Sequence, residues 1–279
     1  MDGLPNRGAG VRSLGLAIPP ERMAPMRGGR PLKRWRYLGL YGPEVMLCAG
    51  DFRVGLLRQQ FWAVAERGRP LRECSSLRSA GVAFDGPQLS LRSASVRLEL
   101  TAEEGEGVES VHPSGRRGYV WTRKQAGVPM RGTLLLDDRT VELDGEGVID
   151  ETAGYHSRHT SWRWSAGVGR SPAGEQLAWN LVEGVNDAPK DSERTVWVGG
   201  EPFEPGPVRF ADDLSAVELT EGGRLEFHEW PGSVREERTN LLVLRSDYRQ
   251  PFGTFAGELP GGLRLAEGFG VMEAHSAAW

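Results

Sequence analysis

Polar side chains of unlike chemistry gather beside three tryptophans in residues 147–180, GVIDETAGYHSRHTSWRWSAGVGRSPAGEQLAWN. An exposed strand needs no such aromatic content, and a packed core would exclude most of the polar groups. Aromatic walls with a few convergent polar groups are typical of a small-molecule pocket. The segment therefore contributes most of the candidate site residues, namely Asp150, Glu151, Tyr155, His156, Arg158, Trp162, Trp164, Trp179 and Asn180.

A carboxyl group in an apolar pocket is a candidate proton donor. Burial disfavours the ionised form, so the pKa rises and the group can donate near neutral pH. We predict Asp150 or Glu151 as the acid, with a proton-transfer partner among Tyr155, His156 and His275. Such a site would support hydration, double-bond isomerisation or cyclisation, and these reactions would require neither a metal nor an organic cofactor.

Protonation of an alkene, a polyene or an enol ether creates positive charge, which the face of an indole ring stabilises. The predicted substrate contacts are therefore the three tryptophans and the polar residues near them, together with an acidic residue close to the carboxy terminus: Trp162, Trp164, Trp179, Asn180, Arg158 and Glu273. If residues 271–275 form a strand, Glu273 and His275 share one face, and the carboxylate would raise the basicity of the imidazole. A surface ion pair is the alternative for these two residues.

Structural roles remain open for the other candidates. Successive residues of a strand point to opposite faces, so at most one of Asp150 and Glu151 enters a pocket, and either carboxylate could instead accept hydrogen bonds from backbone or arginine groups. Trp162 and Trp164 share a face of their strand and would also suit a packed core.

Several classes of site and partner are not expected. Basic and acidic residues number 34 and 38, without the cationic excess that nucleic acids select. His156 and His159 have a helical metal-ligand spacing, but their Gly-, Ser- and Thr-rich surroundings favour a strand or loop, so we predict no metal site. The sequence contains no G-x-S-x-G nucleophile motif and no phosphate-binding loop. A basic cluster near the amino terminus is expected to pair within the protein rather than with a membrane surface: Arg27, Arg30, Lys33, Arg34 and Arg36.

Composition predicts an all-β fold. The 279 residues include 38 Gly and 18 Pro scattered along the chain, so periodic runs are short and end at turns. Ser95–Leu100 and Gly118–Thr122 are examples of predicted strands. Thr239–Arg245 does not alternate, so this segment fits either a strand buried on both faces or a short helical turn. Cys48 and Cys74 are too few for a disulfide framework, which favours a reducing cytoplasm. We expect neither a signal peptide nor a membrane span.

The chain is long enough for two β domains. We predict an extended amino-terminal arm over residues 1–30 and two antiparallel β domains, barrels or sandwiches, over residues 31–145 and 146–279. The boundary is placed in LLLDDRTVELDGEGVI, ahead of the aromatic segment.

Several sequence runs resemble a bacterial family, domain of unknown function 2804. They are KRWRYLG at Lys33–Gly39, VMLCAGD at Val45–Asp51, FWAV at Phe61–Val64, DETAGYH at Asp150–His156, WRWSAG at Trp162–Gly167, WNLV at Trp179–Val182, and GFGVMEAH at Gly268–His275 followed by Trp279. More distantly, Gly147 and Asp150 ahead of Trp162–Trp164, with the later Gly174, are similar to the central motif of the AttH and carotenoid 1,2-hydratase group. That resemblance implies two lipocalin-like barrels and a pocket for isoprenoid or other lipophilic molecules. In the hydratase pattern a His soon follows the Asp, whereas Glu151 stands here, so the hydration activity itself is not carried over.

Two functional hypotheses follow. The first is a cofactor-independent enzyme that acts on a lipophilic small molecule by acid–base chemistry. The second is a non-catalytic carrier that holds an apolar ligand in the same cavity. The density of ionisable groups beside the aromatic segment favours the enzyme, since a carrier needs shape and apolarity more than titrating side chains. In a third arrangement, both barrels are packed solid and the function lies on the surface between them. No feature of the sequence indicates the oligomeric state.

Overall fold

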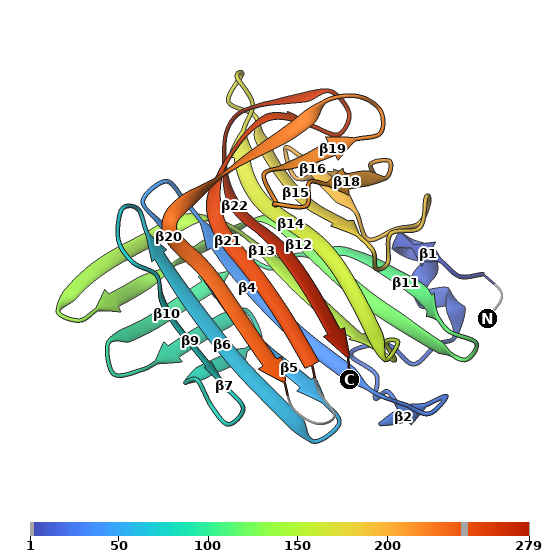
Figure 1. Ribbon diagram of the computed structural model, residues 1–279. Coiled ribbons are helices and arrows are strands. Elements are labelled where there is room, and N and C mark those ends of the chain that lie inside the picture. The colour runs from blue at the N-terminus through green and yellow to red at the C-terminus, as the bar shows by residue number, and fades with distance from the viewer. Residues whose placement is uncertain (1–2, 241–244, 279) are drawn as a thin grey trace.

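Two large antiparallel sheets make up almost the whole chain, and each curls around an interior of its own (Figure 1). The computed structural model describes residues 3–240 and 245–278. The predicted all-β class, with two lipocalin-like units in tandem, is confirmed as two curled half-barrels. Residues 241–244 of the predicted segment Thr239–Arg245, and Trp279, lie outside the described residues.

The first sheet has the order β7-β6-β5-β4-β13-β12-β10-β9-β8, and β11 joins β12 to the short β1. Its strands are β1 (Asn6–Arg7), β4 (Lys33–Tyr41), β5 (Val45–Val54), β6 (Leu57–Glu66), β7 (Arg72–Ser76), β8 (Val82–Asp85), β9 (Gln88–Arg92), β10 (Val96–Ala102), β11 (Val108–Ser114), β12 (Gly118–Leu136) and β13 (Arg139–Gly154).

The second sheet has the order β17-β16-β15-β14-β22-β21-β20-β19-β18. Its strands are β14 (His159–Arg170), β15 (Gln176–Glu183), β16 (Thr195–Val198), β17 (Glu201–Phe203), β18 (Val208–Phe210), β19 (Ala216–Leu219), β20 (Arg224–Asn240), β21 (Arg245–Leu259) and β22 (Leu263–Ala278). In both sheets the central strands are the long ones, and in Figure 1 those of the second sheet cross in front of those of the first.

The amino-terminal arm is partly ordered into short elements. It contains the 3₁₀ helix η1 (Gly8–Leu14) and a small hairpin of β2 (Met26–Arg27) with β3 (Arg30–Pro31). Val11, Ile18 and Met23 are buried against Tyr119 of β12 and Tyr155, which directly follows β13. Apolar contacts therefore hold the arm, which the sequence predicted only as an extended segment.

The change from one sheet to the other falls between Gly154 and His159. β13 pairs with β4 and β12 up to Gly154, so the start of the aromatic segment still belongs to the first sheet. This point comes later in the chain than the predicted boundary between residues 145 and 146. The domain division itself stays a prediction.

Strict alternation explains how each sheet separates two apolar layers. In β13, Ile149 points into the interior of the first sheet, whereas Val148 points towards the second sheet. In β15, Trp179 points into the interior of the second sheet, and Ala178 faces the first. Apolar side chains thus fill both interiors, and a third apolar layer joins the two sheets.

A glycine in β14 makes room for the largest side chain of the second interior. Gly167 lies opposite Trp179, and a Cβ at this position would come within 2.3 Å of the indole ring. The missing side chain lets the fully buried Trp179 lie across the neighbouring strand. Its indole is therefore a packing element of the interior.

Candidate active site between the sheets

A cavity of about 590 Å³ lies between the two sheets and is lined by residues of both. This volume suits a small organic molecule. Its aromatic walls come from β4, β5 and β6 on one side and from β14 and β21 on the other: Trp35, Tyr37, Phe52, Phe61, Trp162, Trp164 and Tyr248. The predicted aromatic pocket therefore has a counterpart, but it lies between the sheets and not inside either curled sheet.

Glu273 is a buried carboxyl group in the wall of this cavity. It is 7% exposed on β22, and its Oε1 accepts a hydrogen bond from Trp162 Nε1 at 2.8 Å. Its Oε2 accepts one from the Tyr248 hydroxyl at 2.9 Å and one from Gln250 Nε2 at 3.0 Å. Burial raises the pKa of Glu273 to about 6, although the hydrogen bonds from Trp162 and Tyr248 act in the opposite direction. Glu273 can therefore hold or release a proton close to neutral pH.

His275 shares the cavity face with Glu273, as the period of two predicted. Its Nε2 lies 2.8 Å from the Ser246 hydroxyl, and its ring packs 4.3 Å from that of Trp162. Burial lowers the pKa of His275 to about 4, so the imidazole is neutral at physiological pH. The predicted increase in basicity is wrong, because desolvation of the imidazolium outweighs the negative charge of Asp247, and Glu273 does not raise the pKa of this imidazole.

A buried ion cluster forms another part of the cavity wall. Asp150 and Lys124 face each other across β13 and β12, with 2.6 Å between Oδ1 and Nζ. Glu193, from the connection between β15 and β16, lies 3.5 Å from the same Nζ. Burial opposes the charge on Lys124, but the two carboxyl groups outweigh it and raise the pKa of this ammonium.

The two carboxyl groups share a single cation in this cluster. Burial raises the pKa of Glu193, and the nearby Asp150 adds to the rise, although Lys124 attracts the ionised form. The cluster can therefore retain a proton that isolated carboxyl groups would release. Asp150 is thus one of two acids held by Lys124 rather than a lone carboxyl group in an apolar pocket.

His156 lines the cavity just beyond the end of β13. It is 4% exposed, its ring lies 5.0 Å from that of Trp35, and its Nε2 has no hydrogen-bond partner in the described part of the chain. Burial, and then the positive charge of Lys33, lower the pKa of His156 to about 3. The group is a neutral imidazole with an unused polar atom.

This burial predicts an effect of pH on stability. Between about pH 6.5 and pH 3 the unfolded chain protonates His156 and the folded chain does not, so stability decreases as pH falls. We expect His156→Gln to reduce this dependence by about 1.4 kcal/mol per pH unit. Urea unfolding at about pH 7 and about pH 5 measures the slope. The matched control is His228→Gln at an exposed position, and equal slopes in both variants would contradict the prediction.

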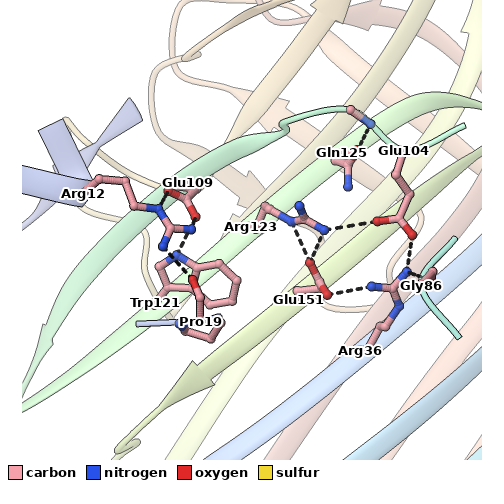
Figure 2. A network of polar contacts seen from close by, with 11 residues as sticks. Arg12, Pro19, Arg36, Gly86, Glu104, Glu109, Trp121, Arg123, Gln125 and Glu151 are labelled. Carbon is pink, nitrogen blue, oxygen red and sulfur yellow. Dashed lines mark hydrogen bonds and ion pairs between the residues drawn. The ribbon is translucent and has the colours of Figure 1, made fainter. Parts of the chain in front are cut away.

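Glu151 lies away from the cavity, on the other face of β13. Its carboxylate binds Arg36 at 2.7 Å and Arg123 at 2.6 Å, and both arginines also bind Glu104 (Figure 2). The expectation that at most one of the neighbouring acids enters the pocket is met, and Asp150 is that acid. Glu151 instead accepts hydrogen bonds from arginine side chains, which was the structural alternative for this residue.

Four further candidates are placed elsewhere. Tyr155 packs on Tyr119, and its hydroxyl donates a hydrogen bond to the Ala24 carbonyl oxygen. These contacts fix the amino-terminal arm. Trp179 fills the interior of the second sheet. Asn180 is fully buried and accepts a hydrogen bond from Trp164 Nε1 at 2.7 Å, so it orients a cavity-lining ring without lining the cavity. Arg158 is exposed in the connection between the sheets.

The sequence did not single out Lys124, Glu193, Arg235 or Tyr248, which all line the cavity. Lys124 gave little local signal, because its neighbours on the same face of β12 are Thr122 and Ala126, one polar and one small. The other three come from segments whose position against the first sheet is a matter of tertiary structure.

Two further properties of the described residues concern ligands and membranes. Among residues 3–240 and 245–278, His, Cys, Asp and Glu side chains form no group of three that could bind a metal ion. No helix in these residues has the length and apolarity required to cross a bilayer. Cys48 and Cys74 are both free thiols.

Comparison with known proteins identifies the fold. The model of the family described as domain of unknown function (DUF2804) matches residues 66–279. A structure from Nitrosomonas europaea described as AttH aligns with a TM-score of 0.56 at 11% identity, covering 94% of this chain and 98% of the other. Kievitone hydratase from Nectria haematococca aligns with a TM-score of 0.54 at 11% identity, covering 87% and 88%. None of the curated proteins matches the chain in sequence.

Proposed function

Because the chain belongs to the DUF2804 family and has the AttH-like fold, we propose that it is an enzyme that acts by acid–base chemistry on a largely apolar small molecule. The substrate occupies the cavity between the sheets. The observation that carries the proposal is Glu273, a carboxyl group whose pKa is raised to about 6 and which lines an aromatic cavity.

Glu273 is the proposed acid. In its protonated form it can transfer the proton to a double bond or an enol ether, and the positive charge that develops then faces the rings of Trp162 and Trp164. Protonation of this kind supports hydration, isomerisation or cyclisation with no metal or organic cofactor. The neighbour named kievitone hydratase is in keeping with the first of these reactions.

Neutral groups are the proposed partners of this acid. His156 and His275 are uncharged at neutral pH and can orient water or the substrate through neutral ring nitrogens, and the Tyr248 hydroxyl already touches the acid at 2.9 Å. The ion cluster of Lys124, Asp150 and Glu193 lines the same cavity. An isoprenoid or a similar lipid-like compound is the proposed substrate class, since the wall is largely apolar and includes seven aromatic side chains.

Incubation of the protein with an isoprenoid and lipid extract tests the proposal. We expect mass spectrometry to find a compound that co-purifies with the protein and a product that differs from it by one water or by rearrangement alone. A compound that binds and is recovered unchanged would identify a carrier instead. Failure to retain any compound would contradict both functions.

A further inference from the structure

A buried arginine lines the same cavity and is not used by the proposed proton transfer. Arg235 lies on β20 and is 2% exposed. Its guanidinium lies 4.1 Å from the centre of the Phe61 ring and 5.1 Å from that of Tyr248. Two aromatic side chains, one from each sheet, therefore fix the position of a permanent positive charge.

The contacts of this guanidinium leave much of its charge and donor capacity available. Nε lies 3.3 Å from a carboxylate oxygen of Glu73, whose side chain is 40% exposed, and Nη1 lies 3.4 Å from the Tyr248 hydroxyl. Glu237, the other nearby acid, accepts hydrogen bonds from Gln59 at 2.7 Å and Ser75 at 2.9 Å. Among the described residues, no hydrogen bond or ion pair involves the Nη2 atom of Arg235. A buried guanidinium normally has closer, bidentate partners, because desolvating its charge is unfavourable.

The geometry points to Arg235 as the anchor for a carboxylate of the ligand. We infer that the cavity takes a lipophilic carboxylic acid, with its apolar body along the aromatic walls and its carboxylate on the guanidinium. This inference rests on the proposed function only in using the same cavity. Glu73 can leave its long contact for water when the ligand carboxylate arrives, because its side chain is partly exposed.

The other charges of the cavity permit an anion at this point. Asp150 and Glu193 lie around Lys124, and Glu273 is partly protonated near neutral pH. Tyr248 connects the anchor to the acid, since its hydroxyl accepts a hydrogen bond from Arg235 and donates one to Glu273. A carboxylate on Arg235 would thus place the nearby carbon skeleton of the ligand beside the proposed acid.

Retinoic acid and retinol provide a matched pair of probes, because they share a polyene and differ in the terminal group. Quenching of tryptophan fluorescence reports binding, since Trp35, Trp162 and Trp164 line the cavity. At neutral pH we expect the wild-type protein to bind retinoate about tenfold to hundredfold more tightly than retinol. We expect Arg235→Met to bind the two probes with equal affinity, at the level of retinol.

Arg58→Met is the matched control, because Arg58 lines the same cavity but is already paired with Asp51 and is 40% exposed. This variant should keep the preference for retinoate. Equal affinities of the wild-type protein for retinoate and retinol would overturn the role of Arg235 as an anchor and leave the proposed enzymatic function intact. This comparison tests the anchor even if Arg235→Met does not fold. Binding of neither probe would count against both the anchor and a lipophilic cavity, whereas a preference for retinoate without turnover would support the anchor alone.

Discussion

Replacement of Glu273 by Gln is expected to lower kcat for the cavity's substrate by a factor of about 10²–10⁴, the usual contribution of a general acid. The amide has the volume of the carboxyl group, and its oxygen can still accept hydrogen bonds from Tyr248 and Gln250, although its nitrogen cannot accept the one from Trp162. We therefore expect KM to change much less than kcat. What is lost is the transferable proton. Steady-state kinetics on the compound identified from the extract measures the effect.

The pH profile distinguishes an acid from a structural carboxyl group. If the protonated form of Glu273 is active, kcat/KM of the wild-type enzyme decreases above about pH 6, tenfold per pH unit. This limb should be absent in Glu273→Gln. Glu151→Gln is the control, because this residue lies outside the cavity in its own ion network (Figure 2). Full activity of Glu273→Gln, or an equal loss in Glu151→Gln, would show that the acid is another group.

Replacement of Lys124 by Met is expected to reduce the free energy of unfolding by about 3–5 kcal/mol at neutral pH, the usual effect of removing one partner from a buried ion pair. Asp150 and Glu193 would be left as two buried acids without their shared cation. Desolvation of an unpaired carboxylate is the main unfavourable term. Urea unfolding, followed by circular dichroism, measures the change.

Arg131→Met provides a control on the same strand. The side chain of Arg131 is 65% exposed, and its ion pairs with Glu103 and Asp144 are on the surface, so we expect a loss of no more than about 1 kcal/mol. The double variant Lys124→Met with Asp150→Asn should recover part of the lost stability, because it removes one uncompensated carboxylate. Equal losses in Lys124→Met and Arg131→Met would mean that the cluster does not depend on its central cation.

The alternation of residues along the sequence was sufficient to predict which side chains share a face of a single strand. The alternation of side chains placed Asp150 and Glu151 on opposite faces of β13, and it placed Trp162 with Trp164, and Glu273 with His275, on common faces. It could not tell that Asp150, and not Glu151, faces the second sheet. That choice depends on which layer each face of the strand meets.

Contacts between distant segments required the tertiary structure. Lys124 meets Asp150 through the register of β12 with β13, and Glu193 reaches the same ammonium from a connection of the other sheet. Tyr248 and Arg235 enter the cavity because β20 and β21 lie against the first sheet. Alternation along a strand carries no information about such pairings, which arise from packing of one sheet on the other.

By itself, the sequence determined the all-β class and pointed to an aromatic, ionisable segment, because short alternating runs and residue types are local properties. The tandem arrangement was predicted from chain length and from the family resemblance. Only the tertiary structure decided that apolar side chains fill the interiors of both sheets and that the cavity lies between them. It also decided which carboxyl group is desolvated enough to hold a proton. Burial depends on every layer packed around a residue, and most of those layers come from distant parts of the chain.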